Sequence, residues 1–364
     1  MSLISGELRA RAKFYAPFVP LLSFSLGFLI DMAFASGLED VTTFVQHSVF
    51  LFLSWFLVVG ELLGVPKGEN FVSLLILRYR RSTVHFCLGS LLSNNFVLFY
   101  RSSSILNSLL VLGVIGALLF VNESKKFQEQ GTPLRVVLAT FCLLCYTSIL
   151  LPVLLGHLGF LPFVASMFLS ALFVWVFVRF YRESVWSFFL EFKRSFSCPV
   201  AIVFSLFLLF YLLKWTPPIP MAMKHVGLYH SVSRSQVSNE KGYRLEFYKD
   251  WWRFWNRSEE HFYRRPGDEV ICFFRIFSPA RFRESLLVSW YHYEDGAWKK
   301  WDEQSLAIAG GRLEGYRGYV KKKNFTSGEW RILFQSKDRR VMAQLDFDVV
   351  DVEEISAPLR IRYF

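Results

Sequence analysis

Lys214–Pro220, with the sequence KWTPPIP, separates two parts of the chain that have different hydropathy patterns. Its three prolines, Pro217, Pro218 and Pro220, end any helix that reaches them, because proline lacks the backbone N–H that a helix interior needs. Long apolar runs precede this segment, and shorter runs with a period of two follow it. We therefore predict three regions, which are an integral membrane helical domain over 1–215, a linker over 216–266 and a β domain over 267–364.

The composition is typical of a membrane protein with a soluble part. Of the 364 residues, 53% are apolar, 18% are aromatic and 20% are charged, and the mean hydropathy is +0.32. Because a soluble globular protein carries about 25% charged residues, these values exclude a disordered chain, a collagen-like chain and an ordinary cytosolic enzyme. The net charge of +11 is spread over both parts without the dense basic clusters of nucleic-acid binders. We therefore expect no nucleic-acid partner.

The first part contains seven apolar segments of a length suited to crossing a membrane. A membrane-spanning helix needs about 20 mainly apolar residues. The segments are 14–35, 43–63, 84–100, 105–121, 134–155, 160–180 and 198–213. The third segment is the weakest, since it is short and holds Asn94 and Asn95. The sequence thus predicts a membrane bundle of about seven helices, with the lipid bilayer as its partner.

Charges in the connecting segments predict the direction of the chain across the membrane. Basic segments, such as the one with Lys125 and Lys126, alternate with segments that hold few or no basic residues, such as the stretch around His157. Connections rich in lysine and arginine remain on the cytoplasmic side. We therefore expect the amino terminus in the cytoplasm and, after seven crossings, the carboxy-terminal domain outside the cytoplasm.

An aromatic run lies within the predicted linker. Residues 251–255 read WWRFW and combine Trp251, Trp252 and Trp255 with an arginine. Aromatic and basic side chains together favour the headgroup zone of a membrane, so these tryptophans are candidates for membrane-interface contacts. Packing against the following domain is the alternative, because spacing alone does not separate the two interpretations.

From Gly267 onward the hydropathy pattern has the period of a β-strand. The clearest example is 341–349, where apolar residues occupy every odd position and Gln344, Asp346 and Asp348 lie between them. One face of such a strand is buried and the other meets solvent. The pattern predicts an antiparallel sheet that is covered on one face.

A turn signal in the same region predicts a β-hairpin. Asp295-Gly296 stands between two strand-like runs, 284–293 and 298–308. An Asp-Gly pair in this position is typical of a two-residue hairpin turn. Several short strands at this spacing predict an all-β fold, either an immunoglobulin-like sandwich or a partial barrel.

Four motifs give residues 268–350 a resemblance to a bacterial family. They are VICFF at 270–274, SWYHY at 289–293, RGYVK at 317–321 and GEWRI at 328–332, the last followed by the closing strand. In this order they resemble the domain-of-unknown-function family 2914, although Ser289 replaces a histidine, and Gly318 and Val320 replace a polar pair. The resemblance implies a Gram-negative envelope location at the inner membrane. It supplies no activity, ligand or catalytic residue.

The sequence holds no established catalytic motif. It contains no phosphate-binding loop, no nucleophile elbow and no His-Glu-x-x-His helix. Cys142 and Cys145 have redox-like spacing, but they lie inside an apolar segment, where we interpret them as small core side chains. We therefore expect no catalytic residue, no metal site and no cofactor.

Polar residues inside the predicted membrane segments are the first functional candidates. They are Asp31, His47, Glu61, Asn94 and Asn95. The alternative is that the ionisable side chains reach the headgroup zone or pair with neighbouring loops, and that the asparagines form hydrogen bonds between helices.

Three tryptophans of the predicted sheet, Trp290, Trp298 and Trp301, are candidates for binding a partner. Exposed on a sheet, they would stack on sugars or peptides, whereas in a core they merely pack, and core packing is the interpretation that we favour. We expect a non-enzymatic inner-membrane protein whose outer β domain binds an envelope protein or polysaccharide. A transporter or sensor, with the β domain as a ligand-capture module, is the alternative, and a membrane enzyme is a third hypothesis. Convergence of the intramembrane polar residues on one cavity would favour the last two.

Overall fold

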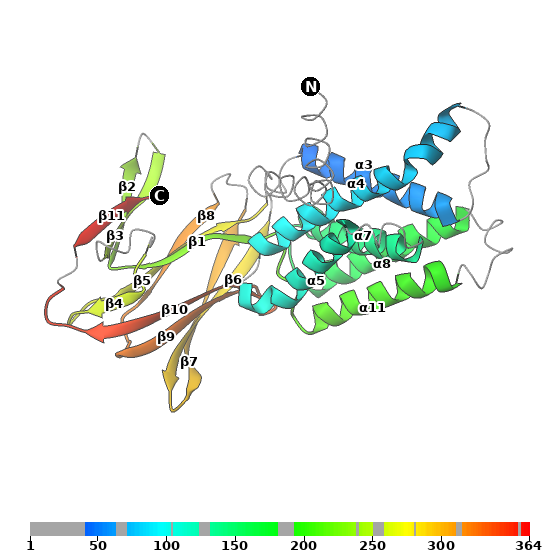
Figure 1. Cartoon of the computed structure of the whole chain (residues 1–364). Coiled ribbons are helices and arrows are strands. Elements are labelled where there is room, and N and C mark those ends of the chain that lie inside the picture. The colour runs from blue at the N-terminus through cyan, green and yellow to red at the C-terminus, as the bar shows by residue number, and fades with distance from the viewer. Residues whose placement is uncertain are drawn as a thin grey trace, which may run out of the picture. The chain divides into compact units, whose positions relative to one another are not determined.

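The computed structural model describes ten segments of the chain. They are residues 41–62, 71–102, 105–123, 132–180, 193–237, 240–249, 258–279, 282–310, 315–355 and 358–364. The chain forms a helical unit and a β-rich unit, and the last boundary between them falls between Thr216 and Pro217, at the proline segment. We call the described residues from Pro217 to Phe364 the β domain. Figure 1 shows both units with their helices and strands labelled.

The described part of the helical unit contains six α-helices rather than seven. They are α3 (Val41–Leu62), α4 (Phe71–Arg101), α5 (Ile105–Glu123), α7 (Thr132–Leu155), α8 (Phe160–Phe180) and α11 (Cys198–Leu212), which follows the π-helix η1 (Lys193–Ser197). These helices correspond to the second to seventh predicted segments. The first predicted segment, 14–35, and with it Asp31, lies outside the described residues.

Four of the described helices are long and apolar enough to cross a membrane. These are α3, α7, α8 and the continuous helix formed by η1 with α11. The apolar part of α5 is shorter, and α4 carries Arg78, Arg80 and Arg81 in its first half. Large apolar side chains such as Phe120, Leu161 and Phe168 are mostly exposed on the outside of the helices. An apolar exterior on helices of this length is compatible with a location in a membrane.

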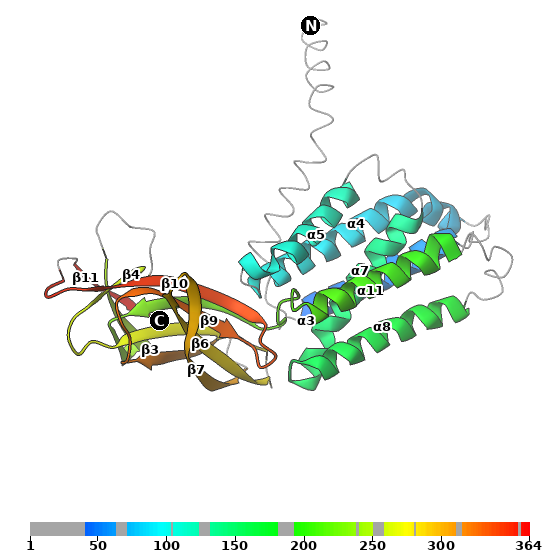
Figure 2. The ribbon, with the colours of Figure 1, turned by 90° about the horizontal axis from the view of Figure 1, so that it is seen from below.

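The β domain contains three sheets. The central sheet has the order β1 (Ala222–Tyr229), β5 (Val270–Phe277) and β8 (Tyr316–Lys322). The five-stranded sheet has the order β4 (His261–Arg264), β10 (Val341–Asp351), β9 (Gly328–Gln335), β6 (Arg283–Glu294) and β7 (Ala297–Ala309). The back sheet has the order β11 (Leu359–Tyr363), β3 (Glu240–Tyr248) and β2 (Ser231–Val237). Figure 2 shows the strands of the five-stranded sheet from a second direction.

Strand β5 explains how the three sheets pack. Its residues Cys272, Phe274 and Ile276 join the main hydrophobic core together with side chains of β6, β9 and β10. Phe273 points to the opposite face and joins a second core with Leu245 and other back-sheet residues. A strand that is covered on both faces needs an almost continuous apolar sequence, which VICFFRIF supplies. The main core therefore lies between the central and the five-stranded sheets, as in a β-sandwich.

The structure confirms the predicted hairpin. Glu294 pairs with Ala297, so Asp295 and Gly296 alone form the turn between β6 and β7. Their φ angles of 52° and 77° are both positive, as a type I′ turn requires. Glycine adopts this angle without strain, and aspartate is among the residues that tolerate it best.

Strand β10 follows its predicted alternation except at one bulge. Phe347 and Val349 are buried, whereas Asp346 is exposed. The pairing with β9 shifts between Val341 and Ala343, and this shift leaves Met342 buried in the core. A bulge inserts one extra residue and thereby reverses the alternation on its far side.

Residues 216–266 are not a linker, because they contain the strands β1, β2, β3 and β4. The signal for β3 is present in the sequence, where Tyr243, Leu245 and Phe247 alternate with polar or half-exposed neighbours and face the second core. The neighbouring strand β2 is rich in serine, and serine clusters are typical of loops. This segment therefore gave no strand signal with which β3 could be paired. Trp251, Trp252 and Trp255, the predicted membrane-interface residues, lie outside the described residues.

Candidate partner-binding face

Glu61 lies in an ion-pair cluster that joins three helices. Its carboxylate pairs with the buried guanidinium of Arg135 from α7 and lies 3.9 Å from Arg80 of α4. Removing one partner of such a pair leaves an uncompensated charge, which is strongly unfavourable. The cluster therefore holds α3, α4 and α7 together, and the partners of Glu61 come from two helices rather than from neighbouring loops.

Among the candidates that the structure describes, His47, Asn94 and Asn95 take no part in the ion-pair cluster of Glu61. The ring of His47 donates a hydrogen bond from Nδ1 to the carbonyl of Thr43 in its own helix, at 2.7 Å. His47 and Glu61 are 14 residues apart on α3, which corresponds to about 21 Å along a helix. Asn95 is buried in α4, and Asn94 is partly exposed.

Several polar contacts between the described helices were not predicted, and the one between α4 and α5 is an example. Asn122 of α5 donates a hydrogen bond from Nδ2 to the carbonyl of His85 in α4, and its Oδ1 lies 3.2 Å from His85 Nδ1. The only available signal was a single polar residue near the end of an apolar run. Such contacts join helices without forming a binding site.

Trp290 cannot bind a partner, because its side chain is fully buried. The even-numbered residues of β6 face the main core, where the Trp290 ring packs edge-on against Phe347. The ammonium group of Lys322, itself buried, lies 5.7 Å from the centre of the same ring. The preference for core packing is therefore correct for Trp290.

Trp301 occupies a bulge at the margin of the core. The pairing of β6 with β7 skips Trp301, because Trp290 pairs with Asp302 and Tyr291 with Lys300. Its ring packs edge-on against Trp330 with a centroid separation of 5.4 Å, yet 44% of the residue stays exposed. A bulge redirects the side chain of the extra residue, and here it places an indole over the end of the core.

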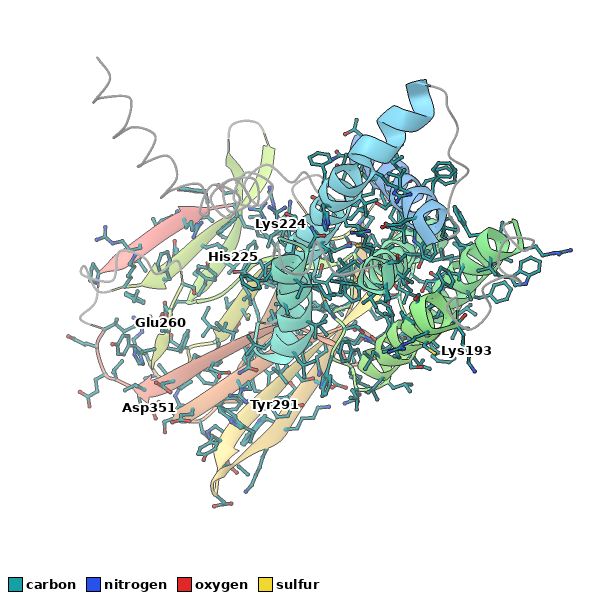
Figure 3. All side chains as sticks on the ribbon, turned by 45° about the vertical axis from the view of Figure 1, so that its right-hand side comes forward. Lys193, Lys224, His225, Glu260, Tyr291 and Asp351 are labelled. Atoms are coloured by element: carbon teal, nitrogen blue, oxygen red, sulfur yellow. The ribbon has the colours of Figure 1, made fainter. Side chains whose placement is uncertain are left out.

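The other face of the five-stranded sheet carries a row of side chains that continues across four strands. Lys300 of β7 pairs with Tyr291 of β6, Tyr291 with Arg331 of β9, and Arg331 with Asp346 of β10. Tyr293 and Trp298 form the next pair on the same face, with ring centroids 5.2 Å apart. We call Tyr291, Tyr293, Trp298, Lys300, Arg331, Gln344 and Asp346 the aromatic face. Figure 3 labels Tyr291 on this sheet.

Arg331 is held in one orientation on the aromatic face. Its Nε and Nη2 donate hydrogen bonds of 2.8 and 2.9 Å to the two carboxylate oxygens of Asp346. The guanidinium carbon lies 4.1 Å from the centre of the Trp298 ring. Gln344 donates from Nε2 to the same carboxylate, at 3.2 and 3.0 Å. The face thus presents an indole, a guanidinium, a carboxylate and an amide in a fixed arrangement.

The aromatic face is open in the part of the chain that the structure describes. Tyr293 is 41% exposed, and Arg331 and Asp346 also reach solvent. By contrast, the back sheet covers the corresponding face of the central sheet at Phe273. Tyr291 and Trp298 are half-buried. Fixed polar groups beside an exposed tyrosine ring are suited to recognising a ligand by stacking and hydrogen bonding.

A buried histidine and glutamate connect strands of all three sheets. His230 Nδ1 lies 2.7 Å from Glu259 Oε1, and His230 Nε2 donates to the carbonyl of Tyr263 at 2.9 Å. Burial lowers the pKa of His230, but the hydrogen bond and charge of Glu259 outweigh it, so the pKa is raised overall. Burial raises the pKa of Glu259 despite the opposing effect of His230.

The described residues contain no group of three or more His, Cys, Asp or Glu side chains that could hold a metal ion. Cys272, within the β domain, is a buried free thiol, and burial raises its pKa, so it is not a reactive nucleophile.

Residues 283–349 match the model of a family described as "Protein of unknown function (DUF2914)". This match confirms the resemblance found in the motifs. It covers β6, β7, β8 and β9 and most of β10, and so it includes the strands that carry the aromatic face.

Two solved structures are similar to parts of the chain at low identity. An immunoglobulin-like protein of Pseudomonas aeruginosa is 14% identical over 35% of this chain and 97% of its own, with a TM-score of 0.19. An alkylpurine DNA glycosylase of Pseudomonas fluorescens, bound to DNA with an abasic site analog, is 10% identical over 90% of this chain and 82% of its own, with a TM-score of 0.21. No curated protein matches the chain.

Proposed function

We propose that this chain is a non-catalytic protein of the bacterial inner membrane whose extracytoplasmic β domain binds an envelope polysaccharide through the aromatic face. One observation carries this proposal. Arg331 is fixed between the Trp298 ring and the Asp346 carboxylate on a sheet face that the described residues leave open. A sugar ring needs an aromatic surface for its C–H groups and fixed donors and acceptors for its hydroxyls, and this face offers both.

The composition of the face favours a polysaccharide over a protein. The centre of a protein interface is depleted in charged groups and rich in large apolar side chains. Here the central row consists of Lys300, Tyr291, Arg331 and Asp346, in which Arg331 pairs with Asp346, and Lys300 pairs with Glu303 of its own strand at 2.6 Å. A surface of paired charges and hydrogen-bonding groups beside an exposed tyrosine ring is better suited to a hydroxyl-rich ligand.

The helical unit is proposed to act as the anchor. Its four apolar helices have the length needed to cross a membrane, and the alternation of basic connections favours a cytoplasmic amino terminus. The polar side chains Glu61 and His47 have separate local partners about 21 Å apart along α3, so these two described residues do not share the single site that the transporter or sensor alternative would favour.

Binding of purified glycans to the full chain in lipid nanodiscs tests the proposal. The probes are peptidoglycan fragments, lipopolysaccharide oligosaccharides and an acidic capsular polysaccharide, each measured by biolayer interferometry. We expect at least one class to bind, and both Trp298→Ala and Arg331→Ala to weaken that binding about tenfold or more, since a loss of about 1.4 kcal/mol corresponds to a factor of ten.

Tyr319→Ala is the matched control. Tyr319 is an exposed aromatic residue on β8 of the central sheet, away from the aromatic face in the strand order. Its removal is expected to leave glycan binding unchanged. Absence of binding to every glycan, or equal weakening by all three variants, would contradict the proposal.

A further inference from the structure

We infer that the edge of β11 is a second binding site, which takes an extended peptide strand of alternating apolar and acidic residues from a protein partner. This site lies on the back sheet and does not depend on glycan binding by the aromatic face. Figure 1 shows β11 in red beside β3. In the described residues, β11 pairs with β3 and forms one edge of its sheet.

The backbone of β11 offers hydrogen-bonding groups at this edge. Phe364 exchanges two backbone hydrogen bonds with Tyr243 of β3, and Lys249 donates one to the carbonyl of Pro358. Because the orientation alternates along an antiparallel strand, the even-numbered residues of β11 direct their N–H and C=O groups to β3. The groups of Leu359, Ile361 and Tyr363 therefore point to the opposite side, toward the open edge.

The same three residues form an exposed apolar stripe. Leu359 is 47% exposed, Ile361 46% and Tyr363 52%, and alternation places them on one face of the sheet. An exposed apolar edge strand is a ready template for pairing with another chain, and natural proteins usually protect such edges with polar or charged residues.

The opposite edge of the back sheet is protected in this way. On the same face, Ser231 and Ser233 of β2 align through β3 with Ile361 and Tyr363. Between them, Arg244 and Glu246 of β3 form an ion pair of 2.8 Å. The face is thus polar on β2 and β3 and becomes apolar at β11, so the two edges of one sheet differ in their capacity to bind a strand.

Charge identifies the occupant of the β11 edge. On the other face of β11, Arg360 is exposed opposite Phe247, and Arg362, opposite Leu245, has its guanidinium carbon 4.4 Å from the centre of the Phe364 ring. A strand added at the open edge places alternate side chains beside the apolar stripe and the remaining ones beside the two arginines. Apolar residues alternating with glutamate or aspartate would satisfy both rows.

A second copy of this chain does not fit the edge. Two β11 strands related by a twofold axis would pair antiparallel. Every register that pairs at least two of the three apolar residues of each copy then sets Arg360 or Arg362 against an arginine of the other copy. Directly opposed like charges destabilise strand pairs, so the occupant has to carry the opposite charge.

Synthetic peptides and the full chain in nanodiscs test this inference. The probes are a fluorescent heptapeptide that alternates isoleucine and glutamate, its counterpart with lysine for glutamate, and the acidic peptide with N-methyl groups on one backbone edge. We expect the acidic peptide to bind, and the other two to bind about tenfold or more weakly, as judged by fluorescence anisotropy.

Arg360→Glu is expected to remove most of the preference for the acidic peptide, because the row then holds one acidic and one basic side chain. Arg234→Glu, which changes an exposed arginine on the protected edge strand β2, is expected to leave the preference unchanged. The N-methylated peptide keeps the test decisive even if the Arg360 variant misfolds. Equal binding of acidic and basic peptides, absence of binding, or dimerisation of the chain through β11 would overturn the inference.

Discussion

The central sheet and the five-stranded sheet share one hydrophobic core but differ at their second faces. On β5 of the central sheet, Phe273 is buried against the back sheet. On β6 and β7 of the five-stranded sheet, Tyr293 and Trp298 lie on a face that remains open. On β5, which is covered on both faces, the side chains of both faces contribute to stability. On β6 and β7, alternate side chains point to the open face and are available for binding, and these side chains form part of the aromatic face.

The largest difference in stability between a substitution on a covered face and one on the open face is expected at Phe274. Phe274 is fully buried between the sheets and packs against Phe334, so Phe274→Ala is expected to lower the free energy of unfolding of the β domain by about 3–5 kcal/mol. Tyr293→Ala on the open face is expected to cost less than about 1 kcal/mol. Urea-induced unfolding in detergent, followed by tryptophan fluorescence, checks both values. Equal costs would remove the distinction between the two faces.

Substitutions of two glycines, one in the central sheet and one in the hairpin turn, test the same difference between covered and open positions. A Cβ atom on Gly318 would lie 2.7 Å from the Phe274 ring, whereas one on Gly296 of the hairpin would meet no atom within 4 Å. Gly318→Ala is expected to cost about 1–3 kcal/mol through overpacking. Gly296→Ala meets no clash, but its positive φ costs about 1–2 kcal/mol. Repacking should therefore be visible by near-ultraviolet circular dichroism in the Gly318 variant and not in the Gly296 variant.

Stability of the β domain is expected to fall with rising pH because of His230 and Glu259. Both pKa values are raised in the folded protein, so both groups stabilise the fold while protonated and lose that contribution as the pH rises through their folded values. The loss begins above the ordinary glutamate value of 4.5 and extends past the ordinary histidine value of 6.5. The apparent Tm should therefore fall as the pH rises, by about 2–4 °C for each kcal/mol of stability that is lost.

His230→Gln should flatten this pH dependence between pH 6 and 9. His261→Gln is the matched control, because His261 is a partly exposed histidine that pairs with the partly exposed Asp348. The control should keep the dependence of the parent chain. If the apparent Tm of the His230 variant still falls with rising pH as in the parent chain, another group is responsible for the titration.

The smallest effect on stability is expected at Asp346. Its bidentate pair with Arg331 is partly exposed, and pairs of this kind contribute about 0.2–1 kcal/mol. Asp346→Ala should therefore leave the unfolding midpoint nearly unchanged and still weaken glycan binding, because Arg331 loses its fixed orientation. A variant that binds like the parent chain would show that Asp346 does not position Arg331 for the ligand.

Local signals predicted the five-stranded sheet well. The Asp295-Gly296 turn has the backbone angles that its residues favour, and the closing strand keeps its alternation at Phe347 and Val349. The bulge at Met342 was not predictable, because a methionine fits an apolar or a half-exposed position equally well. Alternation alone also could not show that Trp290 faces the core and Trp298 the open side, since the face that a sheet covers is decided by tertiary packing.

The back sheet was missed for a physical reason. Its strand β2 holds three serines and an arginine, and short-range signals in such a segment predict a loop. It is a strand because it pairs with β3, whose Leu245 and Phe247 find their core only at Phe273 of β5. The aromatic face likewise could not be predicted from the sequence. Its residues Trp298, Arg331 and Asp346 come from three strands, and only the register of these strands shows that they are neighbours.

Hydroxyl-radical footprinting tests most directly whether the aromatic face is the occupied surface. Oxidation of Tyr291, Tyr293 and Trp298 would be compared between intact envelopes and the purified chain in nanodiscs. We expect strong protection of these three side chains in the envelope and full reactivity after purification, with the buried Trp290 unreactive in both. Equal oxidation of Tyr293 and Trp298 in the two states would contradict partner binding at this face.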